Sequence, residues 1–255
     1  PSPVYDAARG TVVLNFNGAP HCRDAAAGGG ANGCGFNQAM RSADGGDTWS
    51  APVSIDDYLG AKGHAAAGPG RGLRLTVGPH AGRLLFIGHR GAYVEDSVWF
   101  TDDGGASYAT SSTLLSGMDE AQLVQNTNGT VIANMRHRAA PAKGRAVALS
   151  DDGGATFGAI VYDAQLPSPV CQASIIRSAQ NGEVYFANPA TTSGRTHGKV
   201  RRSPTGLPGS WTGSLDVTEG KFGYSCLTDV PQQGMLGLLW EQSPNIVFSL
   251  LPLEF

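Results

Sequence analysis

An eight-residue pattern recurs along the chain and constrains its fold more than any other feature. Three segments fit Ser/Thr-x-Asp-x-Gly-x-Ser/Thr-aromatic: Ser42–Trp49, Thr101–Tyr108 and Ser150–Phe157. A fourth, Ser203–Trp211, keeps both Ser residues, a Gly and the aromatic residue, but it lacks the Asp and is one residue longer. The first positions, 42, 101, 150 and 203, are 59, 49 and 53 residues apart. This period is typical of one four-stranded sheet per repeat, the blade of a β-propeller.

The octapeptide predicts a tight turn between two strands. Its Asp carboxylate can accept hydrogen bonds from backbone N–H groups of the same turn, and its glycines can supply positive φ angles. We expect the terminal aromatic ring to pack between sheets and anchor the turn. A calcium loop is the competing interpretation, but the alternating oxygen ligands and the Glu at the twelfth position are missing. We therefore predict a structural turn at each motif and no metal there.

Composition and local signals favour an all-β chain. Glycine (36) and proline (15) together make 51 of 255 residues, so the chain turns often and long helices are not expected. The strand-like runs Ser97–Phe100 and Ala146–Leu149 each precede a motif. Asn128-Gly129 and Asn181-Gly182 are hairpin signals between apolar runs. We expect one domain over residues 1–255.

Charge and residue spacing exclude several classes of function. The formal net charge of -3 argues against a sequence-independent grip on nucleic acid, which requires a basic surface. No apolar run reaches the roughly 18 residues that a transmembrane helix requires. The sequence has no HxxxH, HxH or CxxC spacing, so neither a metal nor another cofactor is expected.

The four cysteines allow two local disulfides without specifying them. Cys22 could pair with Cys34 and Cys171 with Cys226, but spacing alone does not fix connectivity. Four thiols are the preferred interpretation.

The octapeptides resemble the Asp boxes of sialidases (neuraminidases), and single-copy segments extend this resemblance over essentially the whole chain. Gly68–Leu75 resembles the family's GxGxGIQL segment, with Arg74 in place of Gln; Gly117–Glu120 and Ala133–Arg136 resemble its MDE and LNSR blocks; Phe186–Pro189, Ser193–Arg195 and Val200–Arg201 resemble FSNP, SR and R; Phe222–Leu227 resembles SYSxL, and Gly237–Glu241 resembles GLLYE. The segments also occur in the family's order, which makes the match specific.

The resemblance implies a six-bladed propeller and an exo-α-sialidase that hydrolyses terminal α-linked sialic acids with retention. Tyr224 would be the nucleophile and Glu120 the base that takes its proton. A neutral phenol suits this reaction, because the attacked carbon bears a carboxylate that would repel an anionic nucleophile. Arg136 and Arg195 would bind this carboxylate in bidentate fashion. Glu241 would orient a further arginine of the site without touching the substrate.

Each of these residues also has a purely structural interpretation. Tyr224 could be a half-buried packing residue with its hydroxyl on a backbone group. Glu120 and Asp119 could be a solvated loop pair, and Arg136 and Arg138 could be exposed at a strand end. The alternative functions are a non-catalytic sialic-acid-binding propeller, an inactive piece of a sialidase, and an Asp-box propeller of unrelated role, either a structural scaffold or a glycosidase that uses paired carboxylates.

Some family features have no counterpart in this chain. The arginine of the family's opening strand and its general-acid Asp are not found, and none of the carboxylates Asp56, Asp57, Asp96 and Asp119 is assigned as the acid. Pro1–Asp6 resembles the stretch that follows the family's first Asp box. We therefore expect the chain to begin after about one to one and a half blades, with roughly a hundredfold or greater loss of activity.

The implied partners follow from the substrate class. They are sialylated glycoproteins, glycolipids such as gangliosides, and oligosaccharides; no nucleic acid is expected, and we expect a monomer. The substrate class suits secretion or a lysosomal or endomembrane lumen, and no segment of the sequence selects between these compartments.

Overall fold

A computed structural model describes residues 1–18, 36–60, 65–91, 93–139 and 141–255. Within these ranges regular structure is almost entirely β; the exceptions are a four-residue helix, α1 (Asp56–Leu59), and the short 3-10 helices Pro141–Lys143 and Pro231–Gln233. The expectation of a β-rich chain without long helices is confirmed for this part of the chain. None of its helices is long and apolar enough to cross a membrane.

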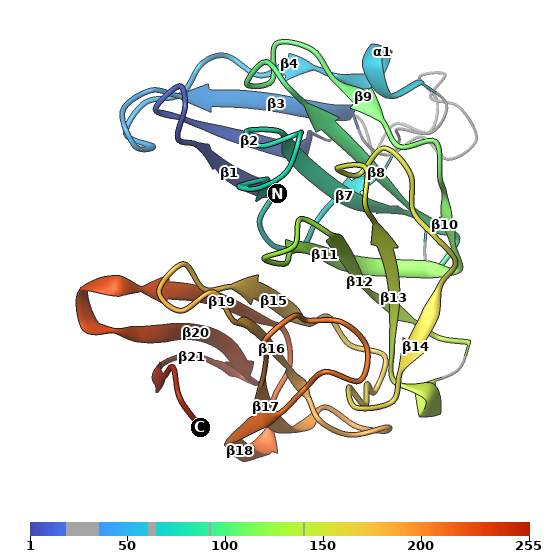
Figure 1. Cartoon of the computed structure of the whole chain (residues 1–255), viewed down its shortest axis with the longest axis vertical. Coiled ribbons are helices and arrows are strands. Elements are labelled where there is room, and N and C mark those ends of the chain that lie inside the picture. Colours follow the sequence, from blue (N-terminus) through green and yellow to red (C-terminus); the bar gives the residue numbers. More distant parts are fainter. Residues whose placement is uncertain (19–35, 61–64, 92, 140) are drawn as a thin grey trace. The chain divides into compact units, whose positions relative to one another are not determined.

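The chain divides into two compact units. The first comprises residues Pro1–Glu120 and Asp152–Phe157, and the second comprises Ala121–Asp151 and Gly158–Phe255. Both units consist of antiparallel sheets built from strands that are consecutive in sequence (Figure 1).

Two sheets form the first unit. The first contains β1 (Ser2–Asp6), β2 (Thr11–Gly18), β3 (Phe36–Ser42) and β4 (Val53–Ser54), hydrogen-bonded in that order. The second is centred on β7 (Leu84–Arg90) and β8 (Glu95–Thr101); β5 (Ala66–Ala67) and β6 (Leu73–Arg74) both pair with β7, whereas β9 (Ala109–Thr110) and β10 (Leu115–Ser116) both pair with β8. Its outer strands are therefore each divided in two. Gly68 (φ 83°) and Gly70 (φ 123°) lie between β5 and β6, and their positive φ angles interrupt the strand there.

Three further sheets complete the described fold. The third sheet consists of β11 (Met118–Gln125), β12 (Val131–His137), β13 (Arg145–Ser150) and β14 (Val161–Asp163). The fourth consists of β15 (Ser174–Arg177), β16 (Val184–Pro189), β17 (Thr196–Ser203) and β18 (Gly213–Lys221). The last consists of β19 (Ser225–Val230), β20 (Met235–Gln242) and β21 (Asn245–Pro252). One meander per repeat is the organisation of propeller blades. The expected four strands per sheet is wrong for the second sheet, which has six strands, and for the last sheet, which has three among the described residues. The six-bladed ring and a missing blade stay predictions.

The octapeptides form the predicted turns, each between the third and fourth strands of a sheet. In the three complete motifs the carboxylates of Asp44, Asp103 and Asp152 accept the backbone N–H of the Thr or Ser four residues later, each at 2.9 Å. Both glycines of each complete motif have positive φ, from 69° to 108°. The turn chemistry expected from the sequence is therefore confirmed.

The aromatic anchors differ among the motifs. Tyr108, Phe157 and Trp211 are buried, at 7% exposure each, as expected. The prediction is wrong for Trp49, which is 36% exposed and donates its indole N–H to the carbonyl of Gly46 in its own turn at 2.9 Å. This ring closes over its own turn and does not enter a core.

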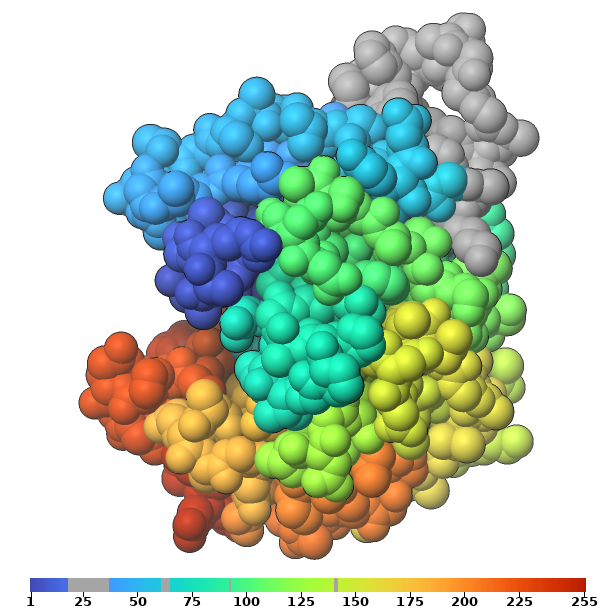
Figure 2. All heavy atoms as spheres, turned by 45° about the horizontal axis from the view of Figure 1, so that its top comes forward, coloured from blue at the N-terminus to red at the C-terminus, as the bar shows by residue number. Residues whose placement is uncertain are grey.

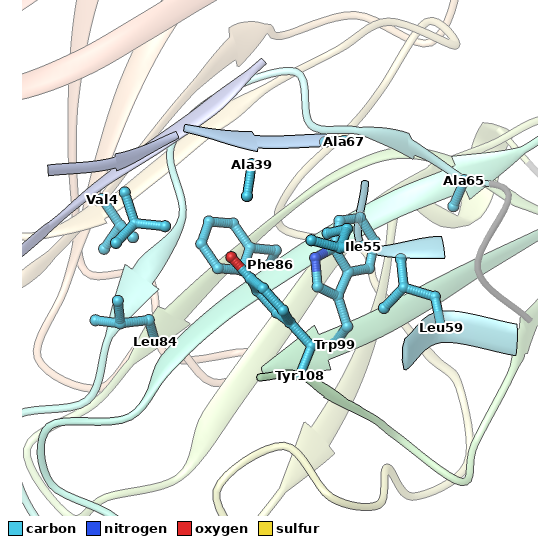
Figure 3. Close-up of a cluster of buried hydrophobic side chains, with 11 residues drawn as sticks. Val4, Ala39, Ile55, Leu59, Ala65, Ala67, Leu84, Phe86, Trp99 and Tyr108 are labelled. Atoms are coloured by element: carbon cyan, nitrogen blue, oxygen red, sulfur yellow. The ribbon is translucent and has the colours of Figure 1, made fainter. Parts of the chain in front are cut away.

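A buried aromatic cluster holds the first unit together (Figure 3). Phe86 stacks on Trp99, with ring centroids 6.2 Å apart, and lies 6.3 Å from the ring of Tyr108. Asn15 connects two of these rings, because it accepts the Trp99 indole N–H at 2.8 Å and donates to the Tyr108 hydroxyl at 3.1 Å. The polar ends of both rings are thus satisfied inside the core.

Both hairpin signals are also confirmed. Asn128-Gly129 lies in the turn between β11 and β12, where Gly129 has a φ of 96°. Asn181-Gly182 lies between the antiparallel strands β15 and β16, and Gly182 has a φ of 80°.

Of the two disulfides that spacing allowed, one can be assessed. Cys171 and Cys226 are both thiols, so they do not form the second pair. Cys22 and Cys34 lie outside the described residues.

One face of the β19–β21 sheet is exposed and apolar. It carries Leu239, Ile246, Phe248 and Leu250, of which Ile246 is 67% and Phe248 57% exposed. The residues of the opposite face, such as Leu238 and Trp240, are buried. Figure 2 shows the C-terminal strands, in red, at the surface of the second unit. We call this patch the β21 face.

Candidate active site

Tyr224 lies immediately before β19, where that strand pairs with β20. Its backbone N–H donates to Oε2 of Glu241 at 3.0 Å, and its carbonyl accepts the backbone N–H of Glu241 at 2.9 Å. Glu241 therefore holds both backbone polar groups of Tyr224, one through its side chain and one through its backbone. The side chain of Tyr224 is half-buried. These contacts fix the point from which the phenol projects.

Gly223 makes room for this arrangement. Its backbone N–H donates to the carbonyl of Glu241 at 2.8 Å, so the pairing continues one residue further. A Cβ atom at position 223 would collide with the Glu241 carboxylate and would lie 3.1 Å from the Glu241 Cβ. The close approach of Glu241 thus requires a glycine here.

Arg136 contacts the phenolic end of Tyr224. It lies on β12, is half-buried, and donates from Nη1 to the Tyr224 hydroxyl at 3.1 Å across 88 residues of sequence. The interpretation of Arg136 as a merely exposed strand-end residue is therefore wrong. A guanidinium at this distance stabilises negative charge on the phenolic oxygen.

Arg195 lies on the ring of the same tyrosine. This exposed residue immediately precedes β17, and its guanidinium carbon is 5.4 Å from the centroid of the Tyr224 ring, within cation–π range. The carbonyl of Arg195 also accepts the backbone N–H of Phe222 at 2.9 Å, which ties the two segments together. Two guanidinium groups thus contact one phenol, one at its hydroxyl and one over its ring.

Glu120 lies on β11, the strand next to β12 in its sheet. Its side chain is half-buried, and its backbone N–H donates to Oδ1 of Asp119 at 2.7 Å. The alternative of a solvated loop pair is therefore wrong, because both residues are part of a strand and Asp119 is buried. Glu120 ends the first of the two segments that form the first unit. Its role as the base for Tyr224 stays a prediction.

The structure brings four of the five expected residues together, namely Arg136, Arg195, Tyr224 and Glu241, all within the second unit. Sequence reasoning missed Gly223 and Gln172. Gly223 occurs inside the segment Phe222–Leu227 that carried the resemblance. Gln172, whose side-chain amide binds the backbone of Ser225 next to Tyr224, has no local signal, because Ser225 is 53 residues away.

Comparisons with known proteins identify the family of the chain. The model of a family described as a BNR repeat-like domain matches residues 1–238. A sialidase of Micromonospora viridifaciens is 35% identical over 222 residues, 82% of this chain and 34% of that protein. A sialidase of Bacteroides fragilis is 30% identical over 80% of this chain and 39% of that protein. The chain belongs to the sialidase family of BNR-repeat domains.

Solved structures of the sialidase family share its fold. A Hadza microbial sialidase superimposes with a TM-score of 0.80 and 26% identity, over 99% of this chain and 52% of that one. An intramolecular trans-sialidase from Ruminococcus gnavus gives a TM-score of 0.74 at 21% identity, which concerns the fold alone. This sialidase-family chain spans little more than a third of the length of the curated relatives named above.

Proposed function

We propose that the protein is an exo-α-sialidase that removes terminal α-linked sialic acids from glycoproteins, glycolipids or oligosaccharides with retention of configuration. Tyr224 is the nucleophile, Glu120 is its base, and Arg136 and Arg195 bind the substrate carboxylate. Family membership and the grouping of two arginines around one tyrosine support this proposal.

The observation that carries it is the hydrogen bond from Arg136 Nη1 to the Tyr224 hydroxyl, 3.1 Å long. The carboxylate of a sialic acid is bonded directly to the carbon that the phenolic oxygen attacks. A guanidinium that touches the attacking oxygen is therefore also within reach of that carboxylate.

The reaction proceeds in two displacements. First, Tyr224 Oη bonds to the anomeric carbon as its proton passes to Glu120, and the bond from that carbon to the leaving oxygen breaks with its electron pair, so that the departing oxygen takes up a proton from solvent. Second, water attacks the same carbon and releases a proton to solvent, while the phenolic oxygen leaves and regains its proton from Glu120. Nucleophile, base and cationic clamp all come from the chain, so the proposal requires no cofactor.

An aryl sialoside tests the proposal directly. A 4-methylumbelliferyl leaving group departs as its anion and takes its proton from solvent, so turnover does not depend on an acid residue. We expect Tyr224→Phe to lower kcat at least about a thousandfold, because the nucleophilic oxygen is lost. The matched control Tyr5→Phe removes the hydroxyl of an exposed tyrosine in the first unit and should leave turnover unchanged.

Two results would overturn the proposal. Equal turnover by wild type and Tyr224→Phe would exclude Tyr224 as nucleophile. Binding of sialic acid that Arg136→Ala abolishes, without turnover by the wild type, would instead identify a non-catalytic binding domain.

A further inference from the structure

A buried glutamine holds the peptide that follows Tyr224. Gln172 is 3% exposed; its Nε2 donates to the carbonyl of Ser225 at 3.0 Å, and its Oε1 accepts the backbone N–H of Ser225 at 2.8 Å. One planar amide thus binds both backbone polar groups of a single residue. This two-point contact fixes the backbone of Ser225 in orientation as well as in position.

The contact completes a set around the proposed nucleophile. Glu241 binds the N–H and the carbonyl of Tyr224, and Gln172 binds those of Ser225. All four backbone polar groups of these two residues are therefore engaged. These contacts fix the backbone of Tyr224 and Ser225, and the backbone sets the direction in which the Tyr224 ring projects.

The segment that carries Gln172 is itself fixed by its surroundings. The carbonyl of Cys171 accepts a hydrogen bond from Nη1 of Arg145 at 2.8 Å, and Arg145 is 1% exposed. Val170 has a φ of 60°, a left-handed conformation that a β-branched residue adopts only where neighbouring structure imposes it. Gln172 is thus presented from a rigid support.

We propose that Gln172 is a positioning residue for Tyr224, which sets the phenolic oxygen at its attack position by holding the Ser225 peptide. This inference rests on the proposed function, since it assigns Gln172 a part in that reaction. Catalysis is sensitive to such support, because a misplacement of about 1 Å can cost about a hundredfold in rate.

The second unit contains a control with the same contact geometry, an exposed glutamine that binds the backbone of another residue. Gln165 accepts the backbone N–H of Trp211 at 3.0 Å and donates to the carbonyl of the same residue at 3.4 Å. Its amide therefore makes the same two-point contact with a structural residue of the fourth octapeptide. Removing each amide in turn separates the loss of two hydrogen bonds from the loss of Tyr224 positioning.

The experiment compares Gln172→Leu with Gln165→Leu on the aryl sialoside, well below the unfolding temperature of either variant. For Gln172→Leu we expect kcat to fall at least about tenfold with KM changed less than about threefold, because the arginines that bind the carboxylate are untouched. Gln165→Leu should keep kcat within about twofold of wild type. Gln172→Asn, which keeps both amide groups on a side chain one methylene shorter, should give an intermediate kcat and serves if Gln172→Leu does not fold.

The positioning role is overturned if Gln172→Leu retains wild-type kcat, or if Gln165→Leu loses as much. Absence of turnover in the wild type would instead contradict the proposed function. In that case hydrogen exchange of the Phe222–Leu227 amides tests whether Gln172 stabilises this segment. It should accelerate at least about tenfold in Gln172→Leu and not in Gln165→Leu, and unchanged protection would refute the contact as a support.

Discussion

At position 223 the site depends on a residue without a Cβ atom. Its φ angle is not in the left-handed region, so the requirement for glycine here is one of space. A methyl group would meet the Glu241 carboxylate, which accepts the backbone N–H of Tyr224. The residue before the proposed nucleophile thereby decides whether Glu241 can hold it.

Substitution of Gly223 by Ala should displace Glu241 and with it Tyr224. We expect kcat/KM on the aryl sialoside to fall about 10- to 100-fold, and the free energy of unfolding to fall by about 1–3 kcal/mol from overpacking. The control is Gly158→Ala, where the nearest atom to a new Cβ is the Leu149 carbonyl oxygen at 3.7 Å. Steady-state kinetics and urea unfolding would measure both effects, and similar results for the two variants would contradict the steric argument.

At the scale of elements, the octapeptide turns are held by ionised carboxylates. Burial raises the pKa of Asp103, but hydrogen bonds from the Ser107 hydroxyl and N–H, and from the Thr101 hydroxyl, outweigh it and lower the pKa to about 2. Hydrogen bonds from the hydroxyl and N–H of Thr48 likewise lower the pKa of Asp44. These turns therefore stabilise the fold only while their carboxylates are charged.

Because the pKa of Asp103 is lower in the folded than in the unfolded chain, the unfolded chain binds more protons at acid pH, and stability rises with pH. The contribution is fully present above about pH 4 and is lost as pH falls through about 2. We expect Asp103→Asn to lower the free energy of unfolding by about 1 kcal/mol at pH 6, since solvent screens this exposed carboxylate. Urea unfolding of both proteins between pH 6 and pH 2 is the measurement, and a gap that does not narrow toward pH 2 would contradict this origin.

At the scale of the whole molecule, the sheets differ in how their faces are covered. The face of the β19–β21 sheet that carries Leu238 and Trp240 is buried in an apolar cluster of the second unit. The β21 face, by contrast, exposes four large apolar side chains on one surface. Exposed apolar sheet faces of this kind favour self-association.

A charge on the β21 face should reduce that tendency. We expect Phe248→Lys to lower concentration-dependent light scattering severalfold, because a hydrated ammonium group resists burial between two molecules. Val161→Lys, at an exposed valine of β14, is the matched control and should scatter like the wild type. Equal scattering by Phe248→Lys and the wild type would show that the β21 face does not mediate association.

The sequence by itself determined the features whose partners lie within a few residues. Asp103 and Ser107 are four positions apart, so the turn forms from its own hydrogen bonds, and the hairpin at Asn181-Gly182 is equally local. The resemblance to sialidases also selected Arg136 and Tyr224 as site residues, but their hydrogen bond joins positions 88 apart.

Tertiary structure alone decided which faces are covered and which distant atoms meet. Trp49 fits the same octapeptide as Tyr108, yet it is exposed, because burial depends on what packs against a ring and not on the motif that carries it. The contact of Gln172 with Ser225 spans 53 residues and has no local signal. Such contacts form where neighbouring sheets pack against each other. A repeat pattern predicts the sheets, but it does not predict which side chains meet between them.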